Sequence, residues 1–442
     1  MKRIFDNYAY GEGPRAGCWW DATCEIPACG PLRENTRTDV AIIGAGFTGL
    51  SAALHLARAG VRVTVLEAQS IGWGASGRNG GFCCLGGGMA SDATLDRRFG
   101  TIGRIDFRRT ELDAIRLVEN IIIENGIDVD RHSDGETILA HRPKDMADLK
   151  SEAAKISENY DVEHILYNAD ELAAQGMTGP YHGGLTVRAG FGINPRKYLA
   201  GLAIAAQKAS AQIFEHSAVS DISAQNGVWL LHANGQQIHA DQVILATNGY
   251  SSEDVPPWLA GRYMPGQSNV IVTRSLSDDE ISKAGWSTDQ MAYDTRNLLH
   301  YFRLMPDRRF LFGMRGGLRT GRKAEARAAV RIRKDFNAMF PAWHDVEVIH
   351  GWSGMVCLSR DTMPFVGAVP EHVGLWAGMC YHGNGVAMGS YSGALLANEI
   401  LGRLSDMRFP KAMKSPLRRF ELGGWRRAVM PFAYAGLMLL DR

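Results

Sequence analysis

The sequence has almost no net charge, no paired cysteine motif and no long apolar run. Its 48 basic and 47 acidic residues leave a formal net charge of +1, so no overall field would draw the protein to nucleic acid. The seven cysteines are odd in number and form no C-x-x-C pair, which argues against a disulfide framework. No run of about 18 apolar residues occurs, and none follows Met1. We therefore expect neither a transmembrane helix nor a signal peptide, and cytoplasm is the default compartment.

Motifs for hydrolytic or metal chemistry are also missing. The 13 histidines form neither an H-E-x-x-H pattern nor a zinc-like spacing with cysteine, and no Ser-His-Asp triad is indicated. We expect no metal. Glycine, in contrast, is abundant at 50 residues, many of them in short clusters. Such clusters are typical of backbone that approaches a ligand closely.

One glycine cluster lies between a strand pattern and a helix pattern. Residues 38–67 read as an apolar strand, the turn G-A-G-F-T-G, a helix, a second strand and a closing Glu67. Gly44 permits the tight turn, Gly46 lets a pyrophosphate approach, and Gly49 lets the helix pack on the strand. The helix N-terminus attracts phosphate, and Glu67 can accept hydrogen bonds from a ribose. The pattern predicts a dinucleotide site, without separating FAD from NAD, at Gly44, Gly46, Phe47, Thr48, Gly49, Glu67 and Ala68.

Three further segments are expected at the same site. The loop 72–81 is rich in glycine, and its Arg78 can neutralise a phosphate. The apolar strand 243–245 opens into small polar residues, as expected beside an adenosine. A glycine-rich turn at 378–385 precedes another helix, whose N-terminus could stabilise negative charge on a reduced cofactor. The contacts predicted from these segments are Gly74, Ala75, Ser76, Arg78, Asn79, Gly80, Gly81, Ala246, Thr247, Gly383, Asn384, Gly385 and Val386.

Several motifs together identify a family. They are the dinucleotide turn, the loop 74–81, Ile193-Asn194-Pro195, Tyr301-Phe302-Arg303-Leu304, Arg360-Asp361-x-x-Pro364-x-x-Gly367 and the last glycine-rich turn. The chain resembles, over about residues 35–405, the D-amino-acid oxidase-like superfamily of FAD enzymes. Within it, the loop 76–81 is most similar to the γ-glutamylputrescine oxidase and L-pipecolate oxidase branch. The resemblance implies FAD as cofactor and oxidation of a C–N bond to an imine, followed by hydrolysis.

The expected fold class is α/β, with a Rossmann-type FAD-binding domain and a second, mixed antiparallel-sheet substrate domain. We assign residues 1–95, 185–262 and 345–442 to the FAD-binding domain, and 96–184 and 263–344 to the substrate domain. Periodicity predicts helices at 104–125, 144–158, 196–210, 322–340 and 386–403, and strands at 268–274, 298–314 and 373–379. Asn234-Gly235 predicts a hairpin turn.

The chain departs from its relatives where a substrate would bind. Glycine oxidase-like members carry an arginine that anchors the substrate carboxylate, and this chain has Val356 there. That favours an amine, or an amino acid held in another way. Arg303 is the replacement we name first, with Arg315 behind it, although a structural role for Arg303 is equally open. Relatives show Ser-Gly-His-Gly in the last turn, so the shifted His382 is either a base or a structural residue. The catalytic candidates are His382, Arg303 and Tyr301.

The tail at 416–442 differs in character from the rest of the chain. Two arginine pairs precede the stretch 428–440, which is almost wholly apolar but too short to span a bilayer. We favour packing on the body of the protein or on a second subunit. The alternative is a tail that lies on a membrane surface with its arginines at the headgroups.

We interpret the chain as an FAD-dependent amine oxidase or dehydrogenase. Its expected substrate is a small amine or an N-substituted or ω-amino acid, and its expected acceptor is O2, which gives H2O2, or a quinone. One alternative is a membrane-associated dehydrogenase that passes electrons to a quinone from the inner face of the membrane. The other is a flavoprotein without catalysis. No nucleic acid partner is expected.

Overall fold

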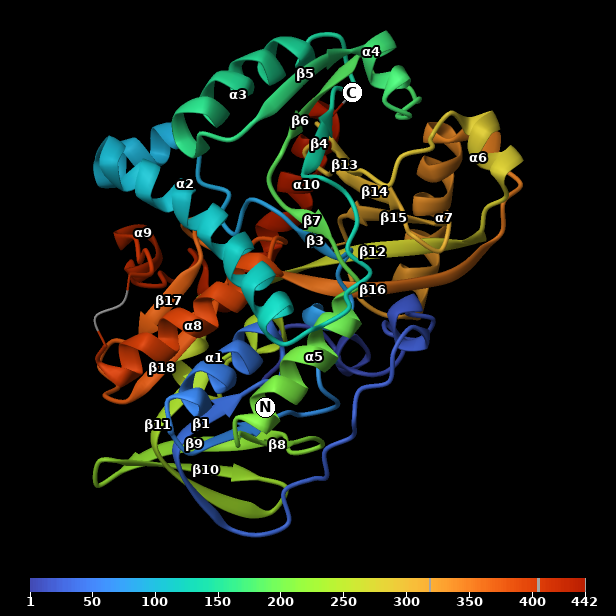
Figure 1. Ribbon diagram of the computed structural model, residues 1–442. Coiled ribbons are helices and arrows are strands. Elements are labelled where there is room, and N and C mark those ends of the chain that lie inside the picture. Colours follow the sequence, from blue (N-terminus) through green and yellow to red (C-terminus); the bar gives the residue numbers. More distant parts are fainter. Residues whose placement is uncertain (318, 404–405, 442) are drawn as a thin grey trace.

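The computed structural model describes residues 1–317, 319–403 and 406–441. The strands of these residues form two large sheets and a short ladder of β3 (Phe82–Cys83) with β7 (Phe191–Gly192). Figure 1 shows the first sheet in the lower lobe and the second in the upper and right-hand part of the molecule. The predicted fold class is confirmed, because one sheet has a parallel centre and the other is mainly antiparallel.

The first sheet is built around β1 (Thr36–Ile43), which pairs in parallel with β2 and β11. Alternate β1 residues enter two different cores, because side chains on a strand alternate between its faces: Val40 and Ile42 on one side, Ala41 and Ile43 on the other. The other strands are β2 (Val63–Leu66), β8 (Gln212–Phe214), β9 (Val219–Gln225), β10 (Val228–Ala233), β11 (Gln236–Leu245), β17 (Phe365–Ala368) and β18 (Leu375–Met379).

Three helices cover one face of this sheet (Figure 1): α1 (Phe47–Arg58), α5 (Pro195–Lys208) and α8 (Ala387–Leu401). α5 and α8 lie within two residues of their predicted bounds, and α1 begins three residues before the start predicted for it at Leu50. The hairpin at Asn234-Gly235 is also confirmed, since both residues have positive φ, +49° and +77°, between antiparallel β10 and β11. Local sequence signals thus suffice for these helices and this hairpin.

The second sheet has the order β16-β12-β15-β14-β13-β4-β6-β5. Its neighbours are antiparallel except for β13 and β4, which run parallel. Phe302, Phe310 and Phe312 on β14 and β15 pack with Phe336 of α7 in an aromatic core behind it. The strands are β4 (Glu136–Leu139), β5 (His164–Asn168), β6 (Gly183–Val187), β12 (Tyr263–Ser275), β13 (Met291–Asp294), β14 (His300–Leu304), β15 (Arg309–Arg315) and β16 (Val348–Ser359). Its helices are α3 (Asp145–Tyr160), α4 (Ala169–Ala174), α6 (Asp278–Ala284) and α7 (Arg322–Met339).

The helix expected at 104–125 is longer than predicted. α2 (Asp92–Glu124) begins after Ser91, whose side chain accepts a hydrogen bond from the N–H of Thr94. Gly100 interrupts the helical dihedral angles at φ +72°. The first turns of α2 contain few apolar residues, so their helical periodicity is weak. The N-cap at Ser91 is the sequence signal that would have extended the predicted helix to its observed start.

The assigned domains and the two sheets divide the chain differently at two places. β6 and β16 overlap ranges that we assign to the FAD-binding domain, yet both pair within the second sheet. β16 pairs with β12 along nearly its whole length, from Ser359 to Val348. The division into two domains stays a proposal, and in it we move these two strands to the substrate side.

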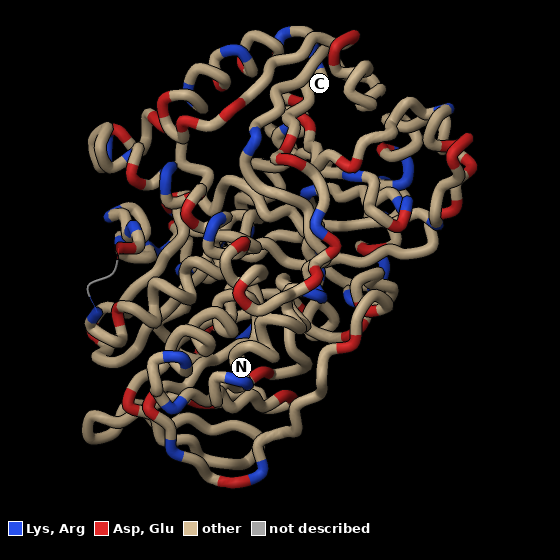
Figure 2. Tube along the Cα trace, viewed as in Figure 1, with Lys and Arg blue, Asp and Glu red and all other residues tan. Residues whose placement is uncertain are grey.

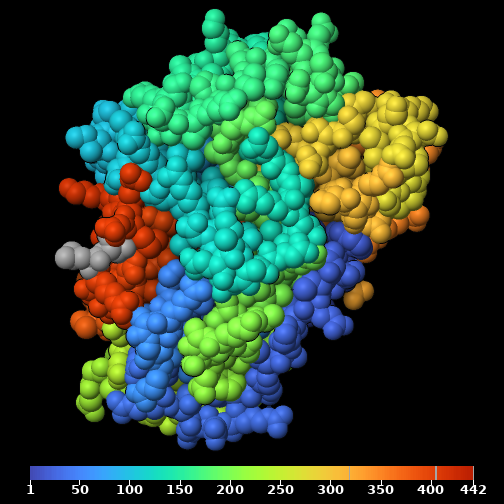
Figure 3. Space-filling model, in the orientation of Figure 1, coloured from blue at the N-terminus to red at the C-terminus, as the bar shows by residue number. Residues whose placement is uncertain are grey.

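Residues before β1 form an ordered arm at the junction of the lobes. It contains η1 (Asn7–Tyr10) and η2 (Trp19–Ala22). The indole N–H of Trp20 donates to the Asn79 carbonyl at 2.8 Å, and Ser353 N–H donates to the Pro14 carbonyl at 2.8 Å. In Figure 3 the arm, in dark blue, runs along the surface from the lower lobe toward the gold segments of the upper one.

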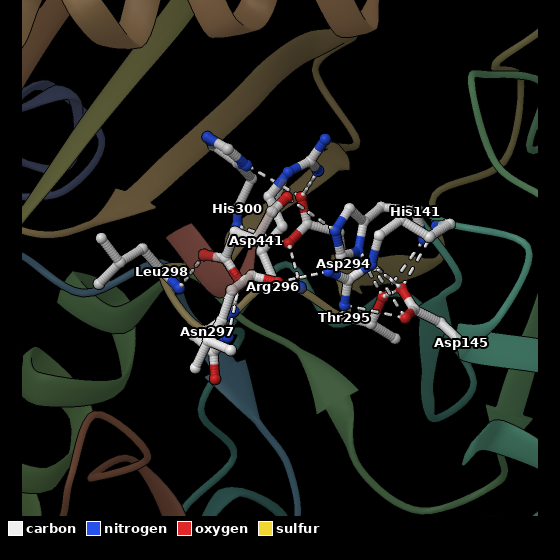
Figure 4. Close-up of polar contacts among 11 residues, drawn as sticks. His141, Asp145, Asp294, Thr295, Arg296, Asn297, Leu298, His300 and Asp441 are labelled. Carbon is white, nitrogen blue, oxygen red and sulfur yellow. Dashed lines mark hydrogen bonds and ion pairs between the residues drawn. The ribbon is translucent and has the colours of Figure 1, made fainter. Parts of the chain in front are cut away.

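The C-terminal tail docks by its end and exposes its flank. After α9 (Lys411–Lys414) and η7 (Gly423–Val429), α10 (Met430–Leu440) leads to Asp441. The Asp441 carboxylate accepts hydrogen bonds from the N–H groups of Asn297 at 2.7 Å and Leu298 at 3.1 Å (Figure 4). Phe432 is 80% exposed. Packing on the body is therefore observed for one side of the tail, and the final residue of the predicted segment, Arg442, lies outside the described residues.

Charge and hydropathy place few constraints beyond these contacts. Figure 2 shows lysine and arginine interspersed with aspartate and glutamate along the trace, in keeping with the near-zero net charge. Among the helices of the described residues, none combines the length and the apolarity that crossing a membrane requires.

The remaining short helices are η3 (Ala75–Gly77), η4 (Asn248–Tyr250), η5 (Pro257–Leu259) and η6 (Pro341–Trp343).

Replacing Asp441 by alanine should release α10. The substitution removes the carboxylate that fixes the helix end to Asn297 and Leu298, so we expect amide hydrogen exchange along α10 to accelerate by about ten-fold. Asp345→Ala is the control, because Asp345 is an exposed aspartate elsewhere on the surface. Equal exchange in the two variants would show that Asp441 does not hold the tail.

Candidate functional site

A cavity of about 440 Å³ lies between the two sheets. One wall is the glycine-rich turn after β1 with the loop that follows β2, and the opposite wall is a face of the second sheet. All of the predicted cofactor contacts line it except Gly49 and Gly81. Segments that are far apart in the sequence therefore converge on one cavity, as the motifs require.

The turn after β1 leaves no room for side chains. Gly44 has φ +108°, and a Cβ there would come within 2.8 Å of the Ala246 carbonyl oxygen. A Cβ on Gly49 would come within 1.9 Å of the Gly44 carbonyl oxygen, so Gly49 is needed for packing and not for lining. α1 starts at Phe47 without a side-chain cap from Gly46. The Phe47 N–H donates to Ser76 Oγ at 3.0 Å, and the N–H groups that follow it, with the positive dipole end of α1, suit an anion.

Glu67 lies at the end of β2, beside this turn. Its carboxylate accepts hydrogen bonds from the N–H groups of Ala45 at 2.8 Å and Gln69 at 3.0 Å. Burial raises the pKa of Glu67 above its ordinary value, against the opposing effect of these N–H groups. Glu67 is fixed in orientation and lines the cavity, as a partner for ribose hydroxyls must be.

Arg78 provides a test of whether the cavity fits an acceptor-rich cofactor. Its guanidinium lies 4.0 Å from the centre of the Trp73 ring and donates to the carbonyls of Trp73 at 2.9 Å and Ser353 at 3.2 Å. Its buried Nη2 has no hydrogen-bond partner among the described residues, and burial lowers the pKa of Arg78. A buried donor without a partner is costly, so a bound acceptor fits here.

Two predicted contacts shape loops instead of offering donors. The Asn79 amide donates to the Ser76 carbonyl at 2.7 Å and accepts from Gly81 N–H at 2.7 Å. The Asn384 amide donates to the Leu85 carbonyl at 2.7 Å. Both residues line the cavity, but their amide N–H groups hold the surrounding backbone in place.

Arg303, the first-named substrate anchor, does not line the cavity and is corrected here. Its side chain is fully buried at 0% exposure. Its guanidinium donates to the carbonyls of Gly81 at 2.6 Å and Ile193 at 2.8 Å. Arg303 therefore positions the glycine-rich loop and the Ile193-Asn194-Pro195 motif, which is the structural role left open by the sequence.

Arg315, the second arginine named as a possible substrate anchor, lines the cavity from the end of β15. Burial lowers the pKa of Arg315. No carboxylate among the described residues lies within ion-pair distance of its guanidinium. Ser268, which pairs with Arg315, and Tyr301 also line the cavity, and a catalytic role for Tyr301 stays a prediction.

His382 lines the cavity as a neutral, oriented ring. Its Nε2 lies 3.1 Å from Ser359 Oγ and accepts a hydrogen bond from the Ser359 backbone N–H at 3.4 Å. Nδ1 has no partner among the described residues. Burial lowers the pKa of His382 to about 4, so the ring is uncharged at neutral pH. Both readings, a base or a structural residue, remain proposals.

Glu136 and Tyr293 line the cavity and were missed from the sequence. Burial raises the pKa of Glu136 to about 8. The sequence signal that could have identified Glu136 is its position as the acidic first residue of the short strand 136–139, whose composition otherwise suits a buried strand.

Comparisons with known proteins agree with this arrangement. The family model described as "FAD dependent oxidoreductase" (DAO) matches residues 39–399. The chain is 31% identical to "Probable oxidoreductase OrdL" of Rhizobium meliloti (strain 1021), over 96% of this chain and 97% of that protein. It is 30% identical to "Gamma-glutamylputrescine oxidoreductase" of Escherichia coli (strain K12), over 92% of each chain. The solved structure of glycine oxidase from Geobacillus kaustophilus shares the fold, with a TM-score of 0.69 at 20% identity, over 87% of this chain and 99% of that one.

Replacing Arg78 by methionine should weaken retention of the cofactor. Methionine keeps the packing against Trp73 but removes the unpartnered donor and the charge, so we expect about ten-fold weaker FAD binding. The measurement is the dissociation constant for FAD added back to apoprotein, followed by flavin fluorescence. Arg116→Met, at an exposed arginine on α2, is the control. Unchanged affinity in Arg78→Met would exclude Arg78 as a cofactor contact.

Proposed function

The chain belongs to the DAO family of FAD-dependent oxidoreductases, and on that premise we propose that it oxidises a C–N bond of an amine or of an N-substituted or ω-amino acid to an imine. In the proposal O2 takes up the electrons and gives H2O2. Two relatives support the substrate class by name: "Gamma-glutamylputrescine oxidoreductase" and "Glycine oxidase" of Bacillus licheniformis. The resemblance inferred from the motifs is thereby confirmed at the level of the family.

Residues of the first lobe fit FAD. The N-terminus of α1 would hold the pyrophosphate, Glu67 the ribose, and Arg78 an acceptor of the cofactor. When bound, FAD supplies the acceptor for the hydride that leaves the substrate carbon. The protein's own task is then to position that carbon and to keep the reacting nitrogen unprotonated.

The cavity opposes a protonated amine at its Arg315 side. Arg315 is a cation without a carboxylate partner among the described residues, and His382 carries no charge at neutral pH. A second positive charge close to Arg315 would be repelled, and the surrounding burial strengthens that repulsion. A neutral amine, which has the lone pair that imine formation needs, is thus favoured there.

The observation that carries the proposal is Arg315 itself. Val356, where relatives anchor a carboxylate, also lines the cavity and offers only an apolar surface. Arg315 is a cation left for an anionic group of the substrate, and β15 lies two strands away from β16 in the sheet. The carboxylate would then be held away from the Val356 position, as suits an N-substituted or ω-amino acid.

A substrate panel tests the function and the anchor together. Sarcosine, pipecolate, ω-amino acids and alkylamines without a carboxylate are mixed anaerobically with the holoenzyme, and flavin bleaching is followed at its visible band. We expect at least one amine to bleach it. Arg315→Gln should raise KM for carboxylate-bearing substrates by about ten-fold relative to its effect on alkylamines, because only the carboxylate-bearing substrates lose a charge-assisted pair.

The outcomes of the panel are separable. Bleaching by no amine at all would remove the proposed function and favour a flavoprotein without catalysis. Equal effects of Arg315→Gln on substrates with and without a carboxylate would retain the function and exclude Arg315 as the carboxylate anchor. Arg116→Gln on the surface is the matched control.

A second candidate, a dehydrogenase at a membrane surface that reduces a quinone, rests on the tail. Trp425 and Phe432 are each 80% exposed, and Leu439 is 65% exposed. Arg418 and Arg419 lie just before this apolar surface in the chain. Exposed aromatic and aliphatic groups with nearby arginines suit the headgroup region of an anionic bilayer.

The acceptor and the tail can be tested in one experiment. With liposomes of anionic lipid and a soluble quinone present, an enzyme of this second kind would sediment with the vesicles and reduce quinone faster than O2. Trp425→Glu with Phe432→Glu would abolish sedimentation, because two charges would enter the bilayer interface. Rapid stoichiometric peroxide release without vesicle binding is what the first candidate predicts, and it would exclude the second.

A further inference from the structure

Glu136 is a buried carboxyl in the cavity that no described cation pairs. Its side chain lines the cavity and the residue is 5% exposed. The neighbouring acid Glu111 differs, because its carboxylate is paired with Arg108 at 3.2 Å and also accepts a hydrogen bond from Tyr160. The thiol of Cys84 is the hydrogen-bonding neighbour of Glu136. A carboxyl buried for structure alone would be expected to have a partner like that of Glu111, since an unpaired one is costly.

The register of the second sheet fixes where Glu136 lies relative to Arg315. Glu136 pairs with Met291 on β13, two residues from Tyr293, and Tyr293 pairs with Tyr301 on β14. Tyr301 in turn pairs with Gly313 on β15, two residues before Arg315. Paired residues, and residues two apart on a strand, share a face. All four side chains therefore belong to the cavity face.

This face carries opposite chemical groups at its two ends. From β15 to β4 there are three strand steps of about 4.8 Å, which make about 14 Å across the strands, and the register displaces Arg315 from the row of Glu136 by a further four residues along them. Tyr301 and Tyr293 occupy the strands between them. A ligand that spans the face would meet a cation on one side, aromatic rings in the middle and a carboxyl group on the other side.

We propose that Glu136 recognises a second, positively charged nitrogen of the substrate, remote from the nitrogen that is oxidised. The inference rests on the proposed function and narrows its substrate class to amines with a distal ammonium group. The ammonium supplies the partner that the protein does not provide, and the neighbouring tyrosine ring of Tyr293 adds a surface on which a cation is attracted.

Protonation makes this recognition pH-dependent. Burial raises the pKa of Glu136 to about 8, so at neutral pH the empty carboxyl keeps its proton and must release it when a cation binds. Affinity for a cation should therefore increase as pH rises toward 8. Burial raises the pKa of Cys84 and of Tyr293 well above this range. Burial also raises the pKa of Glu111, and its ion pair with Arg108 opposes that rise. The paired residue of β6, Val187, has no titratable group.

The first experiment compares two substrates that differ by one ammonium group. The holoenzyme and Glu136→Gln are reduced anaerobically with 1,5-diaminopentane and with n-pentylamine. Glutamine keeps the shape of a carboxyl that is already protonated in the empty cavity, so folding is spared. We expect KM for the diamine to rise by about ten-fold or more, with kcat unchanged, and no change for the monoamine. Glu163→Gln, at an exposed glutamate, is the control.

A loss of rate with both substrates would overturn the proposal and make Glu136 part of the reaction at the oxidised nitrogen. No change with either substrate would overturn it as well. A second measurement does not depend on turnover: binding of n-butyltrimethylammonium to the oxidised holoenzyme, followed by the flavin absorption spectrum from pH 6 to pH 9.

The proposal expects this cation to bind the unmodified enzyme more tightly as pH rises to about 8, and Glu136→Gln to remove that pH dependence. Sodium butyrate, which would bind at Arg315, should be insensitive to Glu136→Gln. If no amine reduces the flavin but the cation still binds through Glu136, the proposed function fails while the recognition site stands. A pH-independent affinity in the unmodified enzyme would exclude Glu136.

Discussion

The buried guanidinium of Arg303 is the constraint on which the two halves of the cavity depend. It belongs to β14 of the second sheet, yet both of its hydrogen-bonded carbonyls, Gly81 and Ile193, lie outside that sheet. Burial lowers the pKa of Arg303 to about 9, Asp130 opposes this only in part, and no carboxylate among the described residues forms an ion pair with it. Carbonyl oxygens must therefore solvate the cation, which fixes the loop of Arg78 against the strand of Tyr301. One side chain thus holds the cofactor wall of the cavity in a fixed position relative to the substrate wall.

This structural role explains why the motif around Arg303 could be recognised from the sequence while Arg303 itself was assigned to the substrate site. The run Tyr301-Phe302-Arg303 lies on one strand, so Tyr301 and Arg303 share a face, and both could be assigned to a substrate. Whether a residue on that face reaches the cavity or the loop beyond it depends on which segments lie against each end of the strand. Those segments come from residues more than a hundred positions away. Arg315 was named only second, because its place on the cavity face follows from its pairing with Ser268, which no local pattern encodes.

The parts predicted correctly are those that depend on adjacent residues. The turn after β1, the α1 helix and the hairpin at Asn234-Gly235 follow from backbone sterics over a few positions. The start of α2 was missed because its first turns are polar and have a weak period, although the cap at Ser91 is a local signal. The sheet membership of β16 could not be predicted in this way, because nothing local shows that its partner is β12. Glu136 was missed for a related reason, because its unusual environment exists only after β4 and β13 come together.

The two ends of the cavity, at Arg315 and at Glu136, favour opposite protonation states of an amine. Near Arg315 an ammonium is disfavoured, so the nitrogen that reacts can be neutral there, whereas near Glu136 an ammonium finds a carboxyl group. One molecule with two nitrogens could then be held with one protonated and the other not, although both have similar pKa values in water. Strand spacing sets the distance over which this difference acts, and low solvent access keeps it from being screened. The second sheet would thus select, by position, which of two chemically similar nitrogens is oxidised.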